Sequence, residues 1–278
     1  MIYFLTCAKL PNLPPQEINA INLLNENKFE TQIVNWDEWE TDSLTENDLV
    51  FLRSTWNYDQ KPQEFLSFLN TLKNSKATVV NSVETMLWNM NKQYMFEFQT
   101  KNILVIPTFH PFEKTELVNQ FPETTQIIAK PIFSAGARGL LKLTKEEWLS
   151  NNLAEIYICQ PFVESVPKSG EWSLIYFDGV YSHSVLKKAK PGDFRVQSDH
   201  GGTVEYVDVP EDWKIQGQDY LKACPSKPFF ARVDLVLWNE QPTLIELEVI
   251  EPELFVTNSI ANKNYRNAIL NRVKRFHE

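Results

Sequence analysis

Short apolar segments alternate with helical segments through residues 1–82, and this alternation constrains the fold more than any other feature of the sequence. The apolar runs predict strands at 2–7, 31–35, 49–53 and 77–81. Between them, apolar residues recur at helical spacing over 16–27 and 63–72. Alternation of strand and helix predicts a parallel sheet that is covered by helices on both faces.

The pattern changes after residue 82. A long helical stretch over 83–101 is followed by predicted strands at 103–109 and 127–130 and a short helix at 145–150. Strands then dominate, with expected ranges 156–162, 171–177, 181–187, 203–208, 229–238 and 243–250, interrupted by a helix at 211–223 and followed by one at 259–276. The chain of 278 residues is thus expected to form an α/β domain (1–82) and a larger α+β part with a seam near residue 155.

The charge balance argues against a nucleic-acid partner. Lys and Arg number 27 and Asp and Glu number 36, so the net charge is −9. An acidic chain has no general affinity for polyanions, although a local basic pocket for a phosphate ligand is compatible with it. Hydrophobic residues make up 43% of the chain, which supplies a sizeable core and excludes a disordered protein.

The cysteines and the N-terminal residues indicate a cytoplasmic location. Cys7, Cys159 and Cys224 lie far apart without a CxxC pair, which argues against a zinc knuckle or a disulfide framework and favours small core residues in a reducing compartment. The apolar segment 1–7 has no preceding basic residues and is too short for a signal peptide or a membrane span. We therefore expect no membrane partner.

Three carboxylates in the last two predicted strands suggest a metal site. Glu246 and Glu248 are two residues apart and share one face of their strand. If the connecting turn centres near Glu240, Asp234 lies opposite Glu246, whereas a slip of one residue would separate them. Carboxylates this close repel one another unless a cation lies among them, and oxygen ligands favour Mg²⁺. The alternative is a hairpin with one polar face in solvent.

A lysine and a loop of small residues form a second candidate. Lys130 ends a buried strand, and the loop 134–139 (SAGARG) follows it. Small residues let backbone N–H groups approach phosphate oxygens closely. The segment lacks the GK[ST] ending of a Walker A loop, and a flexible turn is the alternative reading.

A cationic segment, KKAKPGDFRVQSDHGG at 187–202, is the third candidate. Four cations fall within nine residues of an acidic chain, and Arg195 offers planar donors to an anion. The alternative is a solvated basic loop. We interpret His200 as a surface-loop residue and His183, in the middle of a strand, as a core or edge residue.

These three elements, in this order, resemble the ATP-grasp ligases. The cationic segment is similar to the glutathione synthetase and ribosomal-protein glutamate ligase branch. The segments RSTWNY (53–58), WNMNKQY (88–94), QPFVES (160–165), GEWSLIYFDGVYSHSV (170–185) and ELEVIEPELF (246–255) look closer to the D-cycloserine ligase branch. The resemblance implies an ATP-grasp fold, with an α/β pre-ATP-grasp domain (1–82) followed by two α+β lobes (83–155 and 156–278) that enclose ATP.

The resemblance also implies roles on the ATP side. Lys92 and Lys130 would contact the phosphates, and the loop containing Ser134, Gly136 and Gly139 would cover them. The hinge against adenine would consist of Gln160, Pro161, Phe162 and Val163, with Glu171 on the ribose.

Further implied roles concern catalysis. Asp234, Glu246 and Glu248 would hold two Mg²⁺ ions, with Mn²⁺ as an alternative. Arg195 would stabilise the γ-phosphate and Arg232 the developing negative charge, with Lys187 as a weaker candidate in the phosphate site.

Three positions depart from the pattern of the relatives. Glu248 stands where many have Asn as the last metal ligand, which makes the site more anionic. Ala137 replaces a glycine of the phosphate loop and is expected to stiffen it. Asn57 stands where the nearest relatives have Asp, so a change in specificity is expected if that Asp contacts substrate.

The implied function is ATP-dependent ligation of a carboxylate to an amine or related nucleophile through an acyl phosphate, with release of ADP and phosphate. The residues Arg53, Ser54, Thr55, Trp56 and Tyr58 follow the third predicted strand, where ligands of open α/β sheets bind, and suit a small amino-acid-like substrate. For Trp56 and Tyr58, packing under the adjoining lobe is the other reading. Modification of a peptide or protein terminus, a phosphotransferase and a non-catalytic ATP-binding module are the alternatives, and a homodimer is compatible with the resemblance.

Overall fold

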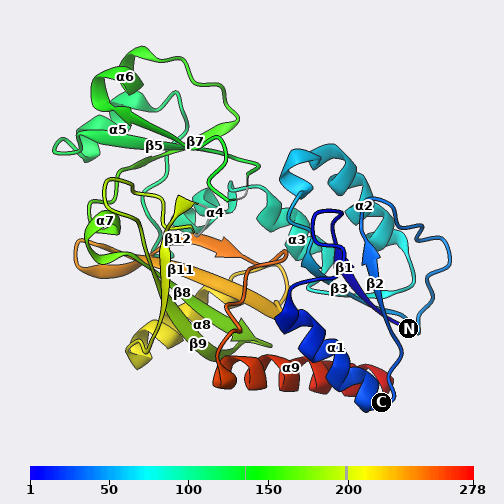
Figure 1. Cartoon of the computed structure of the whole chain (residues 1–278). Coiled ribbons are helices and arrows are strands. Elements are labelled where there is room, and N and C mark those ends of the chain that lie inside the picture. Colours follow the sequence, from blue (N-terminus) through cyan, green and yellow to red (C-terminus); the bar gives the residue numbers. More distant parts are fainter. Residues whose placement is uncertain (135, 198–199) are drawn as a thin grey trace.

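The computed structural model describes residues 1–134, 136–197 and 200–278, and its strands form three sheets (Figure 1). The first is a four-stranded sheet near the N-terminus. The second is a three-stranded sheet in a lobe that stands apart from the rest of the chain in Figure 1. The third, with five strands, forms the centre of the C-terminal lobe. This is the predicted combination of one α/β unit with two α+β lobes.

The N-terminal sheet is parallel, as predicted. Its strands follow the order β2 (Thr31–Asn35), β1 (Ile2–Thr6), β3 (Leu49–Ser54) and β4 (Thr78–Val80). Its helices are α1 (Pro15–Glu26) and α2 (Pro62–Asn74), and a 3-10 turn, η1 (Tyr58–Gln60), precedes α2. Both helices begin with a proline at the first helical position, where the missing N–H costs nothing and the fixed φ favours the helix.

The central sheet is antiparallel, with the order β6 (Leu141–Thr144), β5 (Gln126–Pro131) and β7 (Tyr157–Pro161). It is covered by α5 (Lys114–Gln120) and α6 (Lys145–Ser150), and a capping box between Thr144 and Glu147 starts α6. Neither β6 nor α5 was expected from the periodicity, because both are short. A seam near residue 155 would assign β7 to the C-terminal lobe, but β7 pairs with β5, so the central sheet extends to Pro161.

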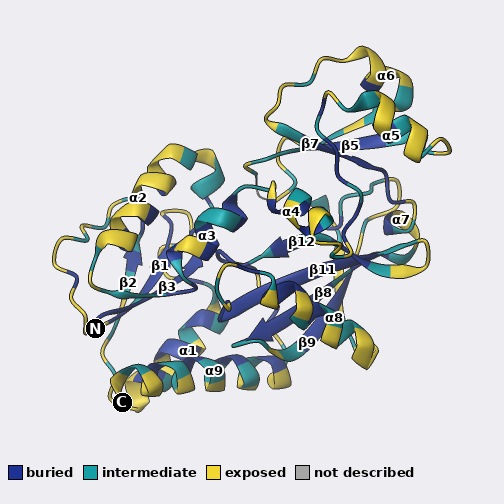
Figure 2. Cartoon of the chain, turned by 180° about the vertical axis from the view of Figure 1, so that it is seen from behind, coloured by how far each residue is buried: buried dark blue, intermediate teal, exposed yellow. Residues whose placement is uncertain are grey.

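The large antiparallel sheet has the order β10 (Thr203–Val207), β9 (Val180–Lys188), β8 (Glu171–Phe177), β11 (Phe230–Trp238) and β12 (Gln241–Glu248). The helices of this part are α7 (Val166–Ser169), α8 (Glu211–Lys222) and α9 (Ser259–His277). In Figure 2, β8 and β11 are almost wholly buried, whereas α9 buries one side and exposes the other. Helices α9 and α1 lie side by side, so the C-terminal end of the chain packs against the N-terminal domain.

The predicted helix over 83–101 is wrong in one important respect, because it is broken in the middle. The structure has α3 (Val83–Met90) and α4 (Tyr94–Thr100), separated by three residues. The Asn91 side chain accepts a hydrogen bond from the Gln93 N–H, a local bond that competes with helix formation. The Lys92 N–H donates instead to the Ile132 carbonyl (3.0 Å), which brings Lys92 to the central lobe.

The predicted strand over 103–109 is also absent as a regular strand. Val105 makes an isolated bridge with Leu244 and Phe109 another with Cys159, so this segment crosses from the large sheet to the central sheet. Pro107 and Pro111 lack the N–H that a continuous ladder requires.

All three cysteines are buried and free, as expected for core residues. Within the described ranges, no helix combines the length and the apolar character needed to cross a membrane.

Asn81 joins the N-terminal domain to the C-terminal lobe. Its amide donates to the carbonyls of Phe230 (2.8 Å) and Val249 (2.6 Å), and its oxygen accepts from the N–H groups of Phe229 and Phe230.

Because the backbone groups that Asn81 binds are buried, we expect Asn81→Ala to lower the free energy of unfolding by about 2–3 kcal/mol. Urea unfolding measures this loss. Asn74→Ala, at the exposed end of α2, is the control, and equal losses in both variants would contradict the prediction.

Candidate functional site

A cleft with an empty volume of about 810 Å³ lies between the central sheet and the large sheet. Its walls come from β5, β7, β8 and β12, together with the segment 194–197. We call it the interlobe cleft. Of the residues predicted to bind ATP or to catalyse, those lining it are Lys92, Lys130, Ser134, Gly136, Gln160, Pro161, Phe162, Val163, Glu171 and Arg195. The structure therefore brings together residues that were selected from widely separated parts of the sequence.

Gly139 is predicted to bind phosphate but does not line the interlobe cleft. Its φ is +71°, and a Cβ at this position would lie 2.9 Å from Pro131 Cγ. The turn therefore needs glycine for its own conformation. The loop also contains Ala135, which lies outside the described residues, and Ala137, whose φ is +59°.

One end of the cleft is apolar and aromatic. The Phe162 and Phe194 rings meet edge to face with centroids 6.0 Å apart, and Lys142 Nζ lies 3.8 Å from the Phe162 centroid. Further apolar residues line the cleft from β5, β12, α7 and two loops, and the sequence had not pointed to them: Ile128, Leu140, Val166, Val196 and Ile245. Phe194 lies in the cationic segment, but the sequence did not predict that it lines the cleft. An aromatic residue between the charged residues Asp193 and Arg195 could have indicated this role.

Two lysines lie at the other end of the cleft. Lys92 Nζ lies 3.1 Å from Glu246 Oε1 and donates to the Ser134 carbonyl at 2.8 Å. Lys130 Nζ is 3.5 Å from the Ile245 carbonyl, and burial lowers the pKa of this lysine. Two ammonium groups in one partly buried site favour an anionic ligand that lies between them.

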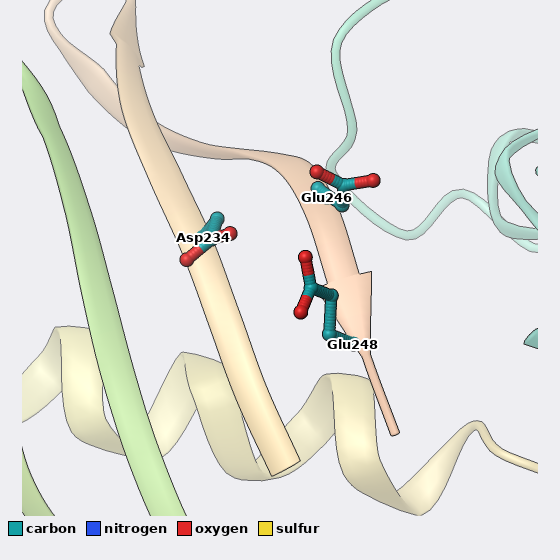
Figure 3. A group of neighbouring side chains, drawn as sticks. All are labelled: Asp234, Glu246 and Glu248. Atoms are coloured by element: carbon teal, nitrogen blue, oxygen red, sulfur yellow. The ribbon is translucent and has the colours of Figure 1, made fainter. Parts of the chain in front are cut away.

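The three predicted metal ligands gather as expected. In the ladder of β11 and β12, Asp234 faces Glu246, as predicted, but a bulge between Asp234 and Leu235 produces this pairing, because the register at the turn would place Asp234 opposite Ile245. The carboxylates of Asp234, Glu246 and Glu248 each offer an oxygen within 4.8 Å of the others (Figure 3). A set of three carboxylate oxygens matches the ligands that Mg²⁺ prefers, so the residues present fit that ion.

Asp234 is buried and is held by several neighbours. Arg232 donates to its oxygens from Nε at 3.0 and 3.1 Å and from its terminal amino group at 2.9 Å, and the Ser173 hydroxyl donates at 2.5 Å. Lys187 Nζ lies 3.4 Å away. Burial by itself raises the pKa of Asp234, but the charges of Arg232 and Lys187 outweigh burial and hold the pKa at about 2. The carboxylate is therefore ionised at neutral pH.

Glu248 is more weakly neutralised. Burial is the main reason that its pKa is raised to about 7, and the negative charges of Glu246 and Asp234 add to the rise. Arg232, which donates to Glu248 Oε1 at 2.5 Å, opposes it.

The raised pKa of Glu248 predicts a pH-dependent affinity for Mg²⁺. A ligand carboxylate must lose its proton to bind the metal, so each pH unit below about 7 should weaken Mg²⁺ binding by about tenfold. Above pH 8 the affinity should be nearly constant. Calorimetric titration with Mg²⁺ alone measures this profile. In Glu248→Gln the affinity for Mg²⁺ should be lower but nearly independent of pH from 6 to 8. If the Mg²⁺ affinity of this variant changed with pH as steeply as that of the unmodified protein, the prediction would be contradicted.

Two of the residues with predicted roles are held in ion pairs in this structure. Glu171, expected at the ribose, is paired with Lys187 at 2.5 Å, so Lys187 links Glu171 to Asp234. Burial raises the pKa of Glu171, and Lys187 opposes this rise. Arg195 is paired with Asp193 of its own loop at 2.9 Å and is partly exposed at the cleft.

The prediction that Arg53, Ser54 and Thr55 bind substrate is not supported by their surroundings. Arg53 is 1% exposed, its guanidinium lies 3.1 Å from Glu17 Oε1, and it donates to the Pro252 carbonyl. Ser54 and Thr55 are fully buried, and their hydroxyls have no hydrogen-bond partner within the described part of the chain. The strand end that was predicted to face a ligand is covered by α1 and by the segment after β12, which lie far away in the sequence.

Trp56 and Tyr58 do reach open space. Trp56 lines a second cavity, of about 1040 Å³, which adjoins the interlobe cleft and shares Glu246 with it. Tyr58 lines a smaller cavity of about 420 Å³, which also borders Glu246, and the Tyr58 ring packs against Phe65 with centroids 4.8 Å apart. These two residues remain candidates for the substrate side.

Asn57 does not line a cavity that contains the acidic cluster. It is buried, its oxygen accepts a hydrogen bond from Trp36 Nε1 at 2.6 Å, and its amide donates to Asp37 Oδ2 at 3.4 Å. An Asp here would place its charge beside Asp37. Asn57 therefore belongs to the hydrogen-bonded interior of the N-terminal domain.

Comparisons with known proteins agree with this arrangement. Residues 2–81 match the family model described as the N-terminal domain of D-cycloserine synthetase DcsG. The chain is 27% identical over 254 residues to the cycloserine biosynthesis protein DcsG of Streptomyces lavendulae, covering 82% of this chain and 83% of the relative.

Solved structures show the same fold. The crystal structure of D-cycloserine synthetase DcsG superposes with a TM-score of 0.78 at 22% identity, over 98% of this chain and 99% of that one. The ATP-grasp ligase PsnB, in complex with a minimal precursor, Mg and ADP, superposes with a TM-score of 0.67 at 14% identity, over 98% of this chain and 97% of that one.

Proposed function

We propose that this chain is an ATP-grasp ligase and that it joins a small amino-acid-like carboxylic acid to an amine or a related nucleophile, with release of ADP and phosphate. Its fold and its similarity to D-cycloserine synthetase support the proposal. The observation that carries the proposal is the convergence of Lys92 and Lys130 with three carboxylates at one end of the interlobe cleft. A second cavity opens beside that end.

ATP fits the division of the interlobe cleft into an apolar and a charged end. In this proposal the adenine ring lies against Phe162, Val163 and Phe194, and the phosphates lie between Lys92 and Lys130. Because Glu171 is paired with Lys187, we assign it to positioning that lysine and no longer to the ribose.

Asp234, Glu246 and Glu248 would hold Mg²⁺, for which we propose two ions. The metal would supply positive charge against the transferred phosphoryl oxygens and thereby lower the barrier for the transfer. Arg232, 8% exposed and bonded to both Asp234 and Glu248, keeps these two carboxylates oriented. Arg195 exchanges its contact with Asp193 for a terminal phosphate oxygen in this proposal.

The reaction would follow two steps. A carboxylate oxygen of the acid attacks the γ-phosphorus, the bond to the β-phosphate oxygen breaks, and ADP leaves. A nitrogen nucleophile then attacks the carbonyl carbon of the acyl phosphate, loses a proton to solvent, and displaces phosphate. Water must be excluded because the acyl phosphate hydrolyses. The loop residue Arg138, which is paired with Asp59 of the N-terminal domain, supports such closure.

This link across the domains favours a small substrate over a peptide. The loop that contains Arg138 borders the second cavity and is held to η1, which encloses the space beside the acidic cluster. The homology to a protein of cycloserine biosynthesis supports the same choice. Similarity to the peptide-bound PsnB is similarity of fold alone.

The test is ADP release with Mg²⁺, ATP and a panel of small amino, hydroxy and amino-oxy acids, with hydroxylamine as a common nucleophile. Hydroxylamine traps an acyl phosphate as a hydroxamate, which mass spectrometry identifies. We expect hydroxamate formation that requires both ATP and a particular acid. ADP release with no hydroxamate from any acid would favour a phosphotransferase, and tight ATP binding without turnover would favour a peptide substrate or a non-catalytic module.

A further inference from the structure

Glu251 is a buried carboxylate, and one of its oxygens has no hydrogen-bond partner among the residues that the structure describes. It is 8% exposed, and its Oε2 atom is buried and accepts no hydrogen bond within the described residues. Its backbone carbonyl, in contrast, accepts a hydrogen bond from Trp56 Nε1 at 3.2 Å. A buried carboxylate oxygen that accepts no hydrogen bond is costly, so its position beside the acidic cluster favours a ligand that completes it.

The position of Glu251 points to the substrate rather than to the metal. It borders both the second cavity and the smaller cavity that Tyr58 lines, and both cavities also border Glu246 and Glu248 of the acidic cluster. The carboxylates that gather within 4.8 Å are Asp234, Glu246 and Glu248, and Glu251 is not among them.

The charges around the second cavity suit a zwitterion. Arg232 and Lys187 border it on the side of the large sheet, whereas Glu251 and the exposed Glu253 border it on the side of the segment that follows β12. If Mg²⁺ neutralises Glu246 and Glu248, the negative charge of this cavity is left mainly on Glu251 and Glu253. Burial, together with the charge of Glu248, raises the pKa of Glu251, which is the effect that a bound cation would reverse.

We propose that Glu251 binds the primary ammonium group of an amino-acid substrate, and that Trp56 lies beside the same group. This inference rests on the proposed function and adds that the acid must carry an amine. A carboxylate is the charge-assisted acceptor that an ammonium requires, and the face of an indole ring also attracts a cation. Glu251 thus distinguishes amino acids from hydroxy acids of the same size.

The test compares matched acids in the hydroxamate assay. Alanine is paired with propionate and with lactate, and serine with 3-hydroxypropionate, using both enantiomers of each chiral acid. The unmodified protein should prefer the amine-bearing acid in kcat/KM. In Glu251→Gln this preference should fall by roughly 10- to 100-fold, mainly through KM for the amino acid, because a charged hydrogen bond is replaced by a neutral one. Glu251→Asp keeps the charge, and its preference for the amine-bearing acid should lie between those of the unmodified protein and Glu251→Gln.

Glu253→Gln is the matched control, since it removes one negative charge from the exposed rim of the same cavity. Its effect on the preference should be less than about threefold, because exposed charges are screened by solvent. Binding of Mg²⁺ and ADP, measured by calorimetry, should be retained in Glu251→Gln, and this binding also shows that the variant is folded.

Several outcomes would overturn the inference. An unchanged preference in Glu251→Gln would show that Glu251 does not bind the amine. A fall in kcat with unchanged KM would indicate a proton acceptor instead, and a loss of Mg²⁺ binding would indicate a metal ligand. Hydroxamate formation without preference for amines in the unmodified protein would reject this inference alone, whereas no hydroxamate from any acid would reject the proposed function as well.

Discussion

Asp234→Asn is expected to lower ATP-dependent turnover by about 10²–10³-fold, the range measured when one group that stabilises a developing charge is removed. Asp234 is buried, its pKa is held at about 2, and it is the carboxylate shared by Ser173, Arg232 and Lys187. A neutral amide of the same shape keeps the packing but removes the charge that would hold Mg²⁺. ADP release under saturating Mg²⁺ and ATP measures the effect.

The stability of this variant must be measured together with its activity. Removal of the Asp234 charge leaves Arg232 still paired with Glu248 and Lys187 still paired with Glu171, so we expect the variant to fold. Thermal unfolding checks this expectation. Asp212→Asn, in the exposed first turn of α8, is the control for loss of one negative charge. If Asp234→Asn kept more than a third of the activity, the acidic cluster would not be the metal site.

The second large effect concerns Arg53, and it separates a structural role from substrate binding. Arg53→Met is expected to lower the free energy of unfolding by about 3–5 kcal/mol, because it leaves Glu17 as an unpaired buried charge. The Arg53 guanidinium also lies over the Phe230 ring, 4.5 Å from the ring centroid. This contact connects the N-terminal domain to the large sheet. Urea unfolding measures the loss.

The double variant Glu17→Gln, Arg53→Met supplies the control. Because it removes both charges, its stability should lie much closer to that of the unmodified protein than the sum of the two single losses predicts. If the single variant Arg53→Met unfolded like the unmodified protein and instead raised KM for the acid, Arg53 would contact substrate and the structural interpretation would be wrong.

Much of the arrangement followed from local sequence patterns. Strand and helix alternation predicted the parallel N-terminal sheet, since the period of the apolar residues is a property of neighbouring positions. The short turn near Glu240 predicted the hairpin, but the register of the turn alone would place Asp234 opposite Ile245. A bulge between Asp234 and Leu235 shifts the ladder by one residue and brings Asp234 opposite Glu246. The resemblance then located the residues that line the interlobe cleft, including Lys130 and Gln160.

Only the tertiary structure decided which charge meets which partner. Arg53 lies near the C-terminal end of β3, close to where a ligand-binding residue would be expected, yet Glu17, 36 positions earlier, neutralises it. Tyr265, 248 positions from Glu17, donates to the same glutamate. Lys187 was expected at phosphate and pairs with Glu171 across β8 and β9. Glu251 belongs to the segment 246–255, which was noted for its predicted metal ligands, and only the packing shows that its buried Oε2 has no hydrogen-bond partner among the described residues. Local patterns fix backbone geometry, whereas the state of a buried charge depends on groups that folding brings from distant parts of the chain.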